Sequence, residues 1–169
     1  MRIFKEQQRF NQIWIIALMT ISILIIIGII ISEYINDPNS FSPMELVLLI
    51  GSLMLISGFI FLLTLTSRID EKGIHYKFFP LHWKFKSIEW NDINKAYVRH
   101  YDAINEYGGW GFKGGWLWKK SKGRAINVSG NLGIQLELKN GKKLLIGTQK
   151  KEEAERILAT YKEKTINNG

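Results

Sequence analysis

The sequence predicts a membrane α-helical hairpin followed by a soluble α+β domain with about seven strands and a C-terminal helix. Two observations predict this fold class. The first is a pair of long runs without any charged residue, from Phe10 to Ser32 and from Leu46 to Ser67. The second is a change after residue 67, where charges become frequent and apolar residues recur at every second position, as in half-buried strands. We therefore divide the chain into residues 1–66, a tail with the hairpin, and residues 67–169, the soluble domain.

Both apolar runs are long enough to cross a bilayer. At 1.5 Å per helical residue, residues 13–31 reach about 28 Å and residues 44–66 about 34 Å, against a hydrocarbon core of about 30 Å. A cleavable signal peptide is the alternative for the first run, because basic residues precede it. The run is too long for that, and no small-x-small cleavage site follows Ile31.

The distribution of charge predicts the orientation of the two spans. Arg2, Lys5 and Arg9 precede the first span, and Arg68 and Lys72 follow the second. The connection, residues 33–43, carries only acidic charges and two prolines, so it is a short loop outside the cytosol. We expect a multi-pass protein of the bacterial inner (cytoplasmic) membrane with both termini in the cytosol.

Small residues lie on one face of each predicted span. Gly28 and Ser32 are four residues apart, and Gly51 and Gly58 are seven apart. Small residues allow helix backbones to approach closely in lipid. This possible helix-packing face serves either the hairpin itself or contact with another membrane subunit.

The soluble domain is predicted to consist of strands up to a final helix. Ile74, Tyr76 and Phe78 alternate with polar residues, as do Trp83 and Phe85 beyond Pro80. Further strands are expected at residues 93–101, 124–128, 134–138 and 142–147. The pair Asn140-Gly141 predicts a type I′ hairpin turn with positive φ at both central residues.

One amphipathic helix is predicted to close the chain over residues 150–164. Its apolar residues fall at i, i+3, i+4 and i+7, which places them on one face. They are Ala154, Ile157, Leu158 and Tyr161. Thr148 is the expected N-cap.

Seven strands followed by a C-terminal helix is the element order of the pleckstrin-homology-like (PH-like) fold. With the hairpin, the chain resembles bacterial membrane proteins that carry a PH-like domain, a largely uncharacterised group. The resemblance rests mainly on residues 106–111, 123–130 and 146–150. It implies a bent antiparallel β-barrel capped by the helix. The acidic turn Asp70-Glu71-Lys72-Gly73 stands where inositide-binding relatives carry basic residues, so inositide binding is not expected.

A glycine-rich excursion is expected between two strands. It comprises Tyr107, Gly108, Gly109, Trp110 and Gly111, with the glycines at positive φ and Trp110 packed back onto the domain. Residues 109–114 also match the dinucleotide pattern G-x-G-x-x-G. That pattern requires a following helix, and the next residues do not predict one.

The excursion continues into a segment that combines aromatic and basic side chains. Aromatic residues favour the membrane interface, and cations favour anionic headgroups. An ordinary solvated face is the alternative. The possible membrane-surface contacts are Trp116, Trp118, Lys119, Lys120, Lys122 and Arg124.

The composition argues against several classes of function. The chain has no cysteine, which excludes disulfides, thiolate metal sites and cysteine nucleophiles. Of the three histidines only His100 lies near a carboxylate, Asp102, and that spacing favours a surface hydrogen bond over a metal site. We therefore expect no catalytic residues, no metal and no cofactor.

Residues 67–169 carry 20 of the 23 Lys and Arg and 11 of the 15 Asp and Glu. No nucleic-acid-binding motif accompanies this charge, and membrane tethering explains it.

The function that this pattern favours is a non-enzymatic, membrane-anchored interaction module. Its partners would be the lipid bilayer and another membrane or cytosolic protein, with no nucleic acid and no evident small-molecule substrate. We expect an accessory subunit of a larger inner-membrane assembly, whose sheet edges accept a peptide strand. The alternative is a lipid-surface or envelope-stress sensor that uses the basic aromatic segment around residues 107–124.

Overall fold

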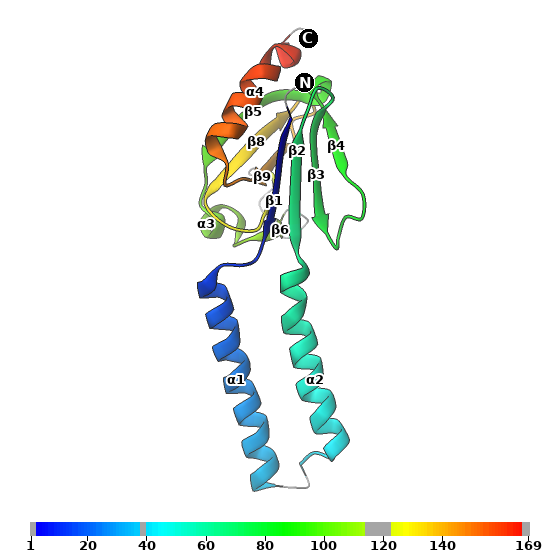
Figure 1. Cartoon of the computed structure of the whole chain (residues 1–169), viewed down its shortest axis with the longest axis vertical. Coiled ribbons are helices and arrows are strands. Elements are labelled where there is room, and N and C mark those ends of the chain that lie inside the picture. The colour runs from blue at the N-terminus through cyan, green and yellow to red at the C-terminus, as the bar shows by residue number, and fades with distance from the viewer. Residues whose placement is uncertain (1–2, 38–39, 114–122, 167–169) are drawn as a thin grey trace. The chain divides into compact units, whose positions relative to one another are not determined.

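The computed structural model describes residues 3–37, 40–113 and 123–166, with side chains as far as Tyr161 (Figure 1). The chain forms two compact units. One is Phe10–Leu62. The other combines Met1–Arg9 with Leu63–Gly169 and contains most of the predicted soluble domain, so we call it the soluble unit. Each unit is described by itself.

The first unit is a pair of apolar helices. Helix α1 (Ile13–Asn36) is followed by α2 (Pro43–Phe59), which continues as a 3-10 turn, η1 (Ile60–Leu62). Both helices are long and apolar enough to cross a bilayer. They expose large apolar side chains, among them Leu24 and Leu55, and such exposure suits lipid rather than water.

Local sequence sets the start of α2. The hydroxyl of Ser42 accepts a hydrogen bond from the Glu45 backbone N–H, and the Glu45 carboxylate accepts one from the Ser42 backbone N–H. This capping box, together with Pro43 in the first turn, starts the helix. The second apolar segment ends at Leu62 and not at the expected Thr66, because Thr64, Leu65 and Thr66 form a strand of the soluble unit.

The first sheet of the soluble unit contains the N-terminal tail. Its order is β1-β2-β3-β4, and every pair is antiparallel. The strands are β1 (Phe4–Arg9), β2 (Thr64–Ile69), β3 (Gly73–Phe79) and β4 (Lys86–Glu89). The expected boundary between residues 66 and 67 is therefore wrong, because residues 1–9 and 63–66 belong to the same unit as the rest of the sheet. Arg9 pairs with Thr64, so the two apolar helices are inserted between neighbouring strands of one sheet.

The second sheet has five strands in the order β5-β8-β9-β7-β6. They are β5 (Ile93–His100), β6 (Gly111–Lys113), β7 (Arg124–Asn127), β8 (Leu132–Leu138) and β9 (Lys143–Gly147). Strands β7 and β9 are parallel, which an antiparallel barrel does not contain. The described residues form two sheets of nine strands in all, not one closed barrel of about seven.

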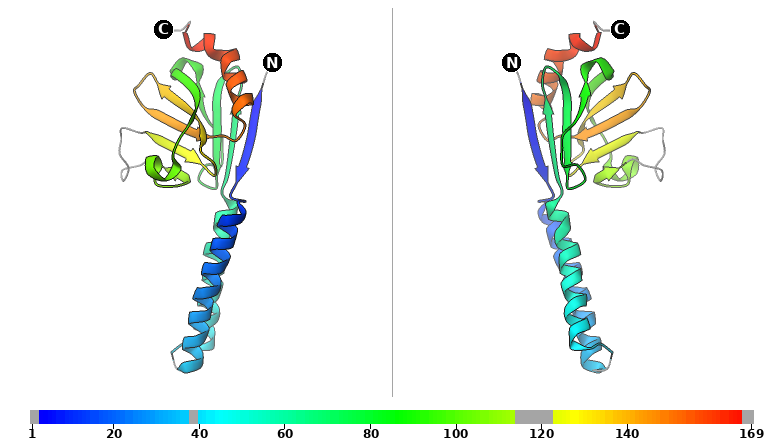
Figure 2. Two further views of the ribbon diagram at one scale, coloured as in Figure 1. Left: turned by 90° about the vertical axis from the view of Figure 1, so that its left-hand side faces the viewer. Right: turned by 90° about the vertical axis from the view of Figure 1, so that its right-hand side faces the viewer.

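Helices and a shared core complete the soluble unit. After η2 (Trp90–Asp92) and β5 comes a short helix, α3 (Ala103–Tyr107), and α4 (Lys151–Ile166) ends the chain. Helix α4 packs against β5, η2 and β1 (Figure 2). The four apolar residues predicted for its inner face are all buried, and Tyr161 stacks on Trp90 with ring centroids 5.5 Å apart. Fully buried side chains come from both sheets: Phe4, Leu65, Ile69, Ile74, Phe78, Ile93, Ile126, Ile134, Leu136, Leu145 and Ile146.

Three local predictions need correction. Trp83 and Phe85 precede β4, which starts at Lys86, so they lie in a loop and not in a strand. The hairpin at Asn140-Gly141 forms, but only Gly141 has positive φ (77°), as in a type I turn followed by one left-handed residue. Thr148 lies three residues before α4, where its hydroxyl accepts from the Lys150 backbone N–H.

Candidate functional site

Among the described residues outside the two apolar helices, the most exposed apolar feature is the loop between β3 and β4, residues 80–85, which we call the 80–85 loop. Leu81, Trp83 and Phe85 are 61%, 78% and 45% exposed. Surface apolar residues are ordinary singly, but three within five positions form a patch. The loop begins immediately after Phe79, which pairs with Thr64, the first residue of β2.

Contacts of His82 hold the 80–85 loop in shape. The His82 backbone N–H donates to the Phe78 carbonyl at 2.7 Å. Its ring meets Tyr76 and Phe112 edge-on, with centroids 5.8 and 5.3 Å away. Burial, and then the charge of Lys86, lowers the pKa of His82, so the imidazole is neutral at pH 7. Because His82 turns inward, its neighbours Leu81 and Trp83 are left exposed.

The charges around the 80–85 loop are basic. Lys84 and Lys86 are exposed, and the Lys77 ammonium lies 5.5 Å from the centre of the Phe85 ring. The acidic residues Asp70, directly after β2, and Glu89, at the end of β4, lie at the other end, where Gly73 pairs with Glu89. One end of the first sheet is therefore aromatic and cationic, and the opposite end carries charges of both signs, with Arg68 and Lys72 beside Asp70.

The end of the sheet that carries Asp70 also contains a row of hydrogen-bonded polar groups. Ser87 Oγ lies 2.7 Å from His75 Nδ1, and His75 Nε2 lies 3.0 Å from the Asp70 carboxylate. Asp70 also pairs with Arg68 at 2.9 Å and accepts from the Lys72 backbone N–H. Burial alone would raise the pKa of Asp70, but the hydrogen bonds from His75 and Lys72 and the nearby positive charges lower it below its usual value.

The order Ser87–His75–Asp70 matches that of a serine-hydrolase triad in connectivity only. Asp70 binds Nε2 and not Nδ1, and Arg68 neutralises its carboxylate. Ser87 is an exposed residue of β4, aligned with His75 across the sheet. The row is better explained as a cross-strand link from β2 through β3 to β4.

A second feature is an open depression of about 600 Å³ beside α3. It is lined by His100, Tyr101, Asp102, Ala103, Ile104, Glu106, Trp110, Gly130 and Asn131. Several of its polar groups already serve the fold. The Asp102 carboxylate caps α3, Glu106 pairs with Arg99 at 2.8 Å, and the Trp110 indole donates to the Gly130 carbonyl at 3.0 Å. The Asp102 oxygens accept from backbone and side-chain N–H groups of α3, so this carboxylate has a structural role at the start of that helix.

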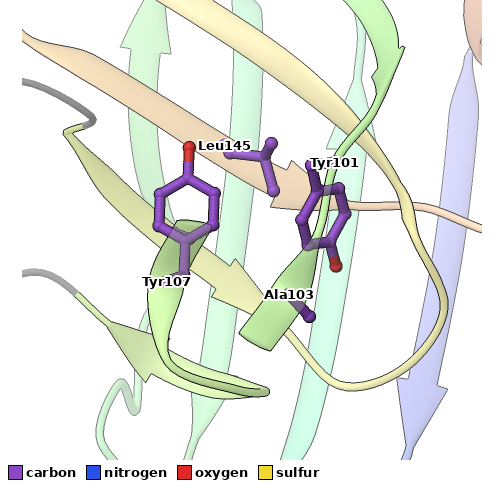
Figure 3. Close-up of a cluster of buried hydrophobic side chains, with 5 residues drawn as sticks. Tyr101, Ala103, Tyr107 and Leu145 are labelled. Carbon is purple, nitrogen blue, oxygen red and sulfur yellow. The ribbon is translucent and has the colours of Figure 1, made fainter. Parts of the chain in front are cut away.

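The glycine-rich excursion has the predicted structural role. Gly108, Gly109 and Gly111 have φ of 70°, 111° and 122°, which glycine adopts without strain. Tyr107 and Tyr101 lie on either side of Leu145, with Ala103 beside them (Figure 3). Trp110 packs against this cluster as expected. Gly111 begins β6, a strand that was not predicted, and the residues after Gly114, where the dinucleotide pattern requires a helix, lie outside the described residues.

The predicted membrane-surface contacts lie largely outside the described residues. Trp116, Trp118, Lys119, Lys120 and Lys122 belong to that segment. Arg124 is exposed at the start of β7. Burial of Tyr76 raises the pKa of its hydroxyl, and the positive charge of Arg124 opposes this rise. The 80–85 loop was not predicted, because the alternation of aromatic and basic residues in it is typical of a strand.

The predicted helix-packing residues do not make close contacts within the hairpin. A Cβ atom added to Gly28, Gly51 or Gly58 would meet no atom within 4 Å. Ser32 accepts a hydrogen bond from the Asn36 side chain of its own helix, at 3.5 Å. Packing inside the hairpin therefore does not account for these small residues.

These features define a class: a two-sheet α+β domain whose sequence is interrupted by two apolar helices. Within the described residues, no group of three or more His, Asp or Glu side chains could hold a metal ion. No family model, curated protein or solved structure matches the chain.

Proposed function

We propose that this chain is a non-enzymatic, membrane-anchored interaction module of the bacterial inner membrane. Helices α1 and α2 would anchor it, and the soluble unit would lie in the cytosol with both termini. Two helices of suitable length and composition support the anchor. The basic residues that flank the apolar segments and the acidic loop between them support the orientation. We propose that it serves as an accessory subunit that binds another protein of a larger assembly.

The observation that carries protein binding is the exposed edge of the first sheet. Strand β4 is its terminal strand and pairs only with β3 among the described strands. Lys86, Ser87 and Glu89 are exposed there. An unpaired strand edge offers backbone N–H and C=O groups to an incoming segment, which is a recurrent mode of peptide recognition.

We also propose that the soluble unit is a variant of the PH-like fold. Two sheets followed by a C-terminal helix against the core support this relation. The parallel pair β7 and β9 and the additional strands set it apart from the regular pattern.

Co-purification in mild detergent tests the accessory-subunit role. The tagged chain, expressed at its native level, should retain a partner at fixed stoichiometry. Proline at Ser87 or at Ile88 then tests the edge, because consecutive N–H groups of a strand point to opposite sides. One of the two variants weakens the β3–β4 pairing and unfolds more easily. The other keeps wild-type stability but should lose the partner.

Ser87→Ala controls for the loss of the hydroxyl that contacts His75. A partner retained by both proline variants would contradict binding at β4. Purification of the chain alone, with no protein at fixed ratio, would contradict the role of accessory subunit.

The alternative function is lipid-surface or envelope-stress sensing through the segment around residues 107–124. The exposed cation Arg124 and the interface-seeking aromatic residues of the sequence favour it. A sensor of this kind should purify alone and change its conformation with the anionic lipid content of liposomes. A protein-binding subunit should not respond in that way.

A further inference from the structure

We propose that the 80–85 loop inserts into the interfacial layer of the bilayer that holds α1 and α2. Leu81, Trp83 and Phe85 would contact the boundary between headgroups and acyl chains, and Lys84 and Lys86 would contact phosphate groups. The inference rests on the proposed function in one respect only, that the two helices span a membrane. It adds a point of membrane contact to the two helices, and this contact is distinct in sequence from the segment around residues 107–124, whose Phe112 meets the His82 ring.

Strand register places the start of the loop beside Thr64, the strand residue of the soluble unit that follows the apolar helices in the chain. Thr64 pairs with Arg9 on one side and with Phe79 on the other. Thr64 is two residues beyond Leu62, the end of η1, so the chain allows at most about 7 Å between them. Phe79 lies one strand spacing further, about 5 Å. The 80–85 loop therefore starts within about 12 Å of the end of the apolar segment.

The length of the loop fits the thickness of the interfacial layer. The polar layer on each side of the hydrocarbon core measures about 5–8 Å, half the difference between the whole bilayer and its core. Three residues, half of the 80–85 loop, reach at most about 10 Å from the end of β3. The tip can thus enter the interfacial layer, and it is too short to cross the bilayer.

The chemistry of the loop suits an interface and not bulk water. Tryptophan and phenylalanine beside lysines form the amphipathic combination found at membrane surfaces, where lysine stems lie along apolar groups and their ammonium groups contact water or phosphate. The acidic residues Asp70 and Glu89, which anionic lipids would repel, lie at the opposite end of the same sheet. Neutral His82 adds no charge to be desolvated at pH 7.

The loop is already in the shape that insertion requires. Hydrogen bonding of His82 to Phe78 and the edge-on contact of Trp83 with Phe79, 5.3 Å between centroids, fix its course. The exposed side chains therefore need little further ordering when they enter lipid, which lowers the entropic cost of binding. A partner protein is the competing occupant of this patch, and purified components distinguish the two.

Single cysteines test the inference cleanly, because the natural chain has none. Trp83→Cys and Leu81→Cys, each labelled with the polarity-sensitive fluorophore bimane, are reconstituted as full chains in liposomes of phosphatidylcholine and phosphatidylglycerol. Lys72→Cys is the matched control, since it is exposed in the turn at the other end of β2 and β3. Nitroxide groups placed on the lipid headgroup or high on the acyl chain report depth.

Insertion predicts blue-shifted emission and strong quenching by nitroxide lipids at residues 81 and 83, with water-like, weakly quenched emission at residue 72. The Leu81→Cys chain retains Trp83 and guards against an effect of removing that ring. Water-like emission at both loop positions, in chains that resist extraction at alkaline pH, would overturn the inference and leave the anchor intact. Extraction of the wild-type chain at alkaline pH would remove the proposed anchor, and the inference with it.

Discussion

The carboxylate of Glu6 accepts a hydrogen bond from the hydroxyl of Thr148 at 2.6 Å, which joins the first strand to the segment before the last helix. The other carboxylate oxygen accepts from the Gln149 backbone N–H at 2.8 Å. Two positions further along β1, the Gln8 side chain donates to the Gly147 carbonyl at 2.9 Å. Residues that lie more than 130 positions apart in the sequence thus meet in the soluble unit.

These hydrogen bonds show that the N-terminal tail is part of the soluble unit. Its basic residues were interpreted as a topology signal, and they can still serve as one. The tail is also a strand of the sheet, with Phe4, Glu6 and Gln8 buried on its inner side. The two apolar helices are therefore an insertion into the domain and not an extension that precedes it.

A chain without the insertion should fold in water. Because Arg9 and Thr64 are paired neighbours, replacing residues 10–63 with Asn-Gly joins β1 to β2 through a two-residue hairpin turn. We expect a monomeric domain that unfolds cooperatively, measured by circular dichroism and size-exclusion chromatography. A fragment that starts at residue 67 lacks β1 and half of β2 and should aggregate. Equal behaviour of the two would mean that β1 does not belong to the domain.

Removing the Glu6 carboxylate should destabilise this water-soluble domain. Glu6→Ala leaves the Thr148 hydroxyl and the Gln149 N–H without their acceptor, at a cost of about 2–3 kcal/mol in the free energy of unfolding. Gln7→Ala, on the exposed side of the same strand, should change it by less than about 0.5 kcal/mol. Urea denaturation measures both. Similar values for the two variants would show that the Glu6 contacts add nothing.

Asp70 should make the stability depend on acid pH. Its pKa in the folded state is below its value in the unfolded chain, so the ionised carboxylate stabilises the fold above about pH 4, and this contribution is lost as the pH falls through the folded-state pKa. Asp70→Asn should be less stable at pH 7 and should lose less stability on acidification. Glu89→Gln, an exposed neighbour across the sheet, is the control. Parallel pH profiles for wild type and Asp70→Asn would contradict this assignment.

Tyr101 should make the stability depend on alkaline pH. Burial raises the pKa of Tyr101 to about 12, although the hydrogen bond from Asn127 opposes this. Since the folded-state pKa lies above that of the unfolded chain, near 10, the contribution is complete below pH 10 and is lost as the pH rises toward 12. Tyr101→Phe should lose less stability over this range, measured by urea denaturation at each pH. An unchanged slope would show that other tyrosines control it.

Much of the secondary structure could be predicted because its signals are local. Uncharged runs specify the two apolar helices, and alternation at Ile74, Tyr76 and Phe78 specifies β3. The four apolar positions of α4 are buried as expected. Strand β1 gives no such signal, because two of its three inward positions are Glu6 and Gln8. Its inner face is identified only by partners near residue 148, which no local pattern contains.

The candidate site was also predictable only in part, because its side chains are evident from the sequence and its loop conformation is not. The sequence of residues 80–85 carries the aromatic and basic side chains, but alternation alone placed Trp83 in a strand. His82 turns inward to contact Tyr76 of β3 and Phe112 of β6, two strands from separate parts of the chain, and this turn leaves Leu81 and Trp83 exposed.

By itself, the sequence determined that the chain has two lipid-compatible helices and a basic, strand-rich domain, because hydropathy and periodicity act over a few residues. Only the tertiary structure decided that the helices interrupt the domain, that β7 and β9 run parallel, and that an aromatic loop follows Phe79, the partner of Thr64 at the start of β2. Those features depend on which strands pair. Pairing is set by the burial of side chains from distant parts of the chain in one core.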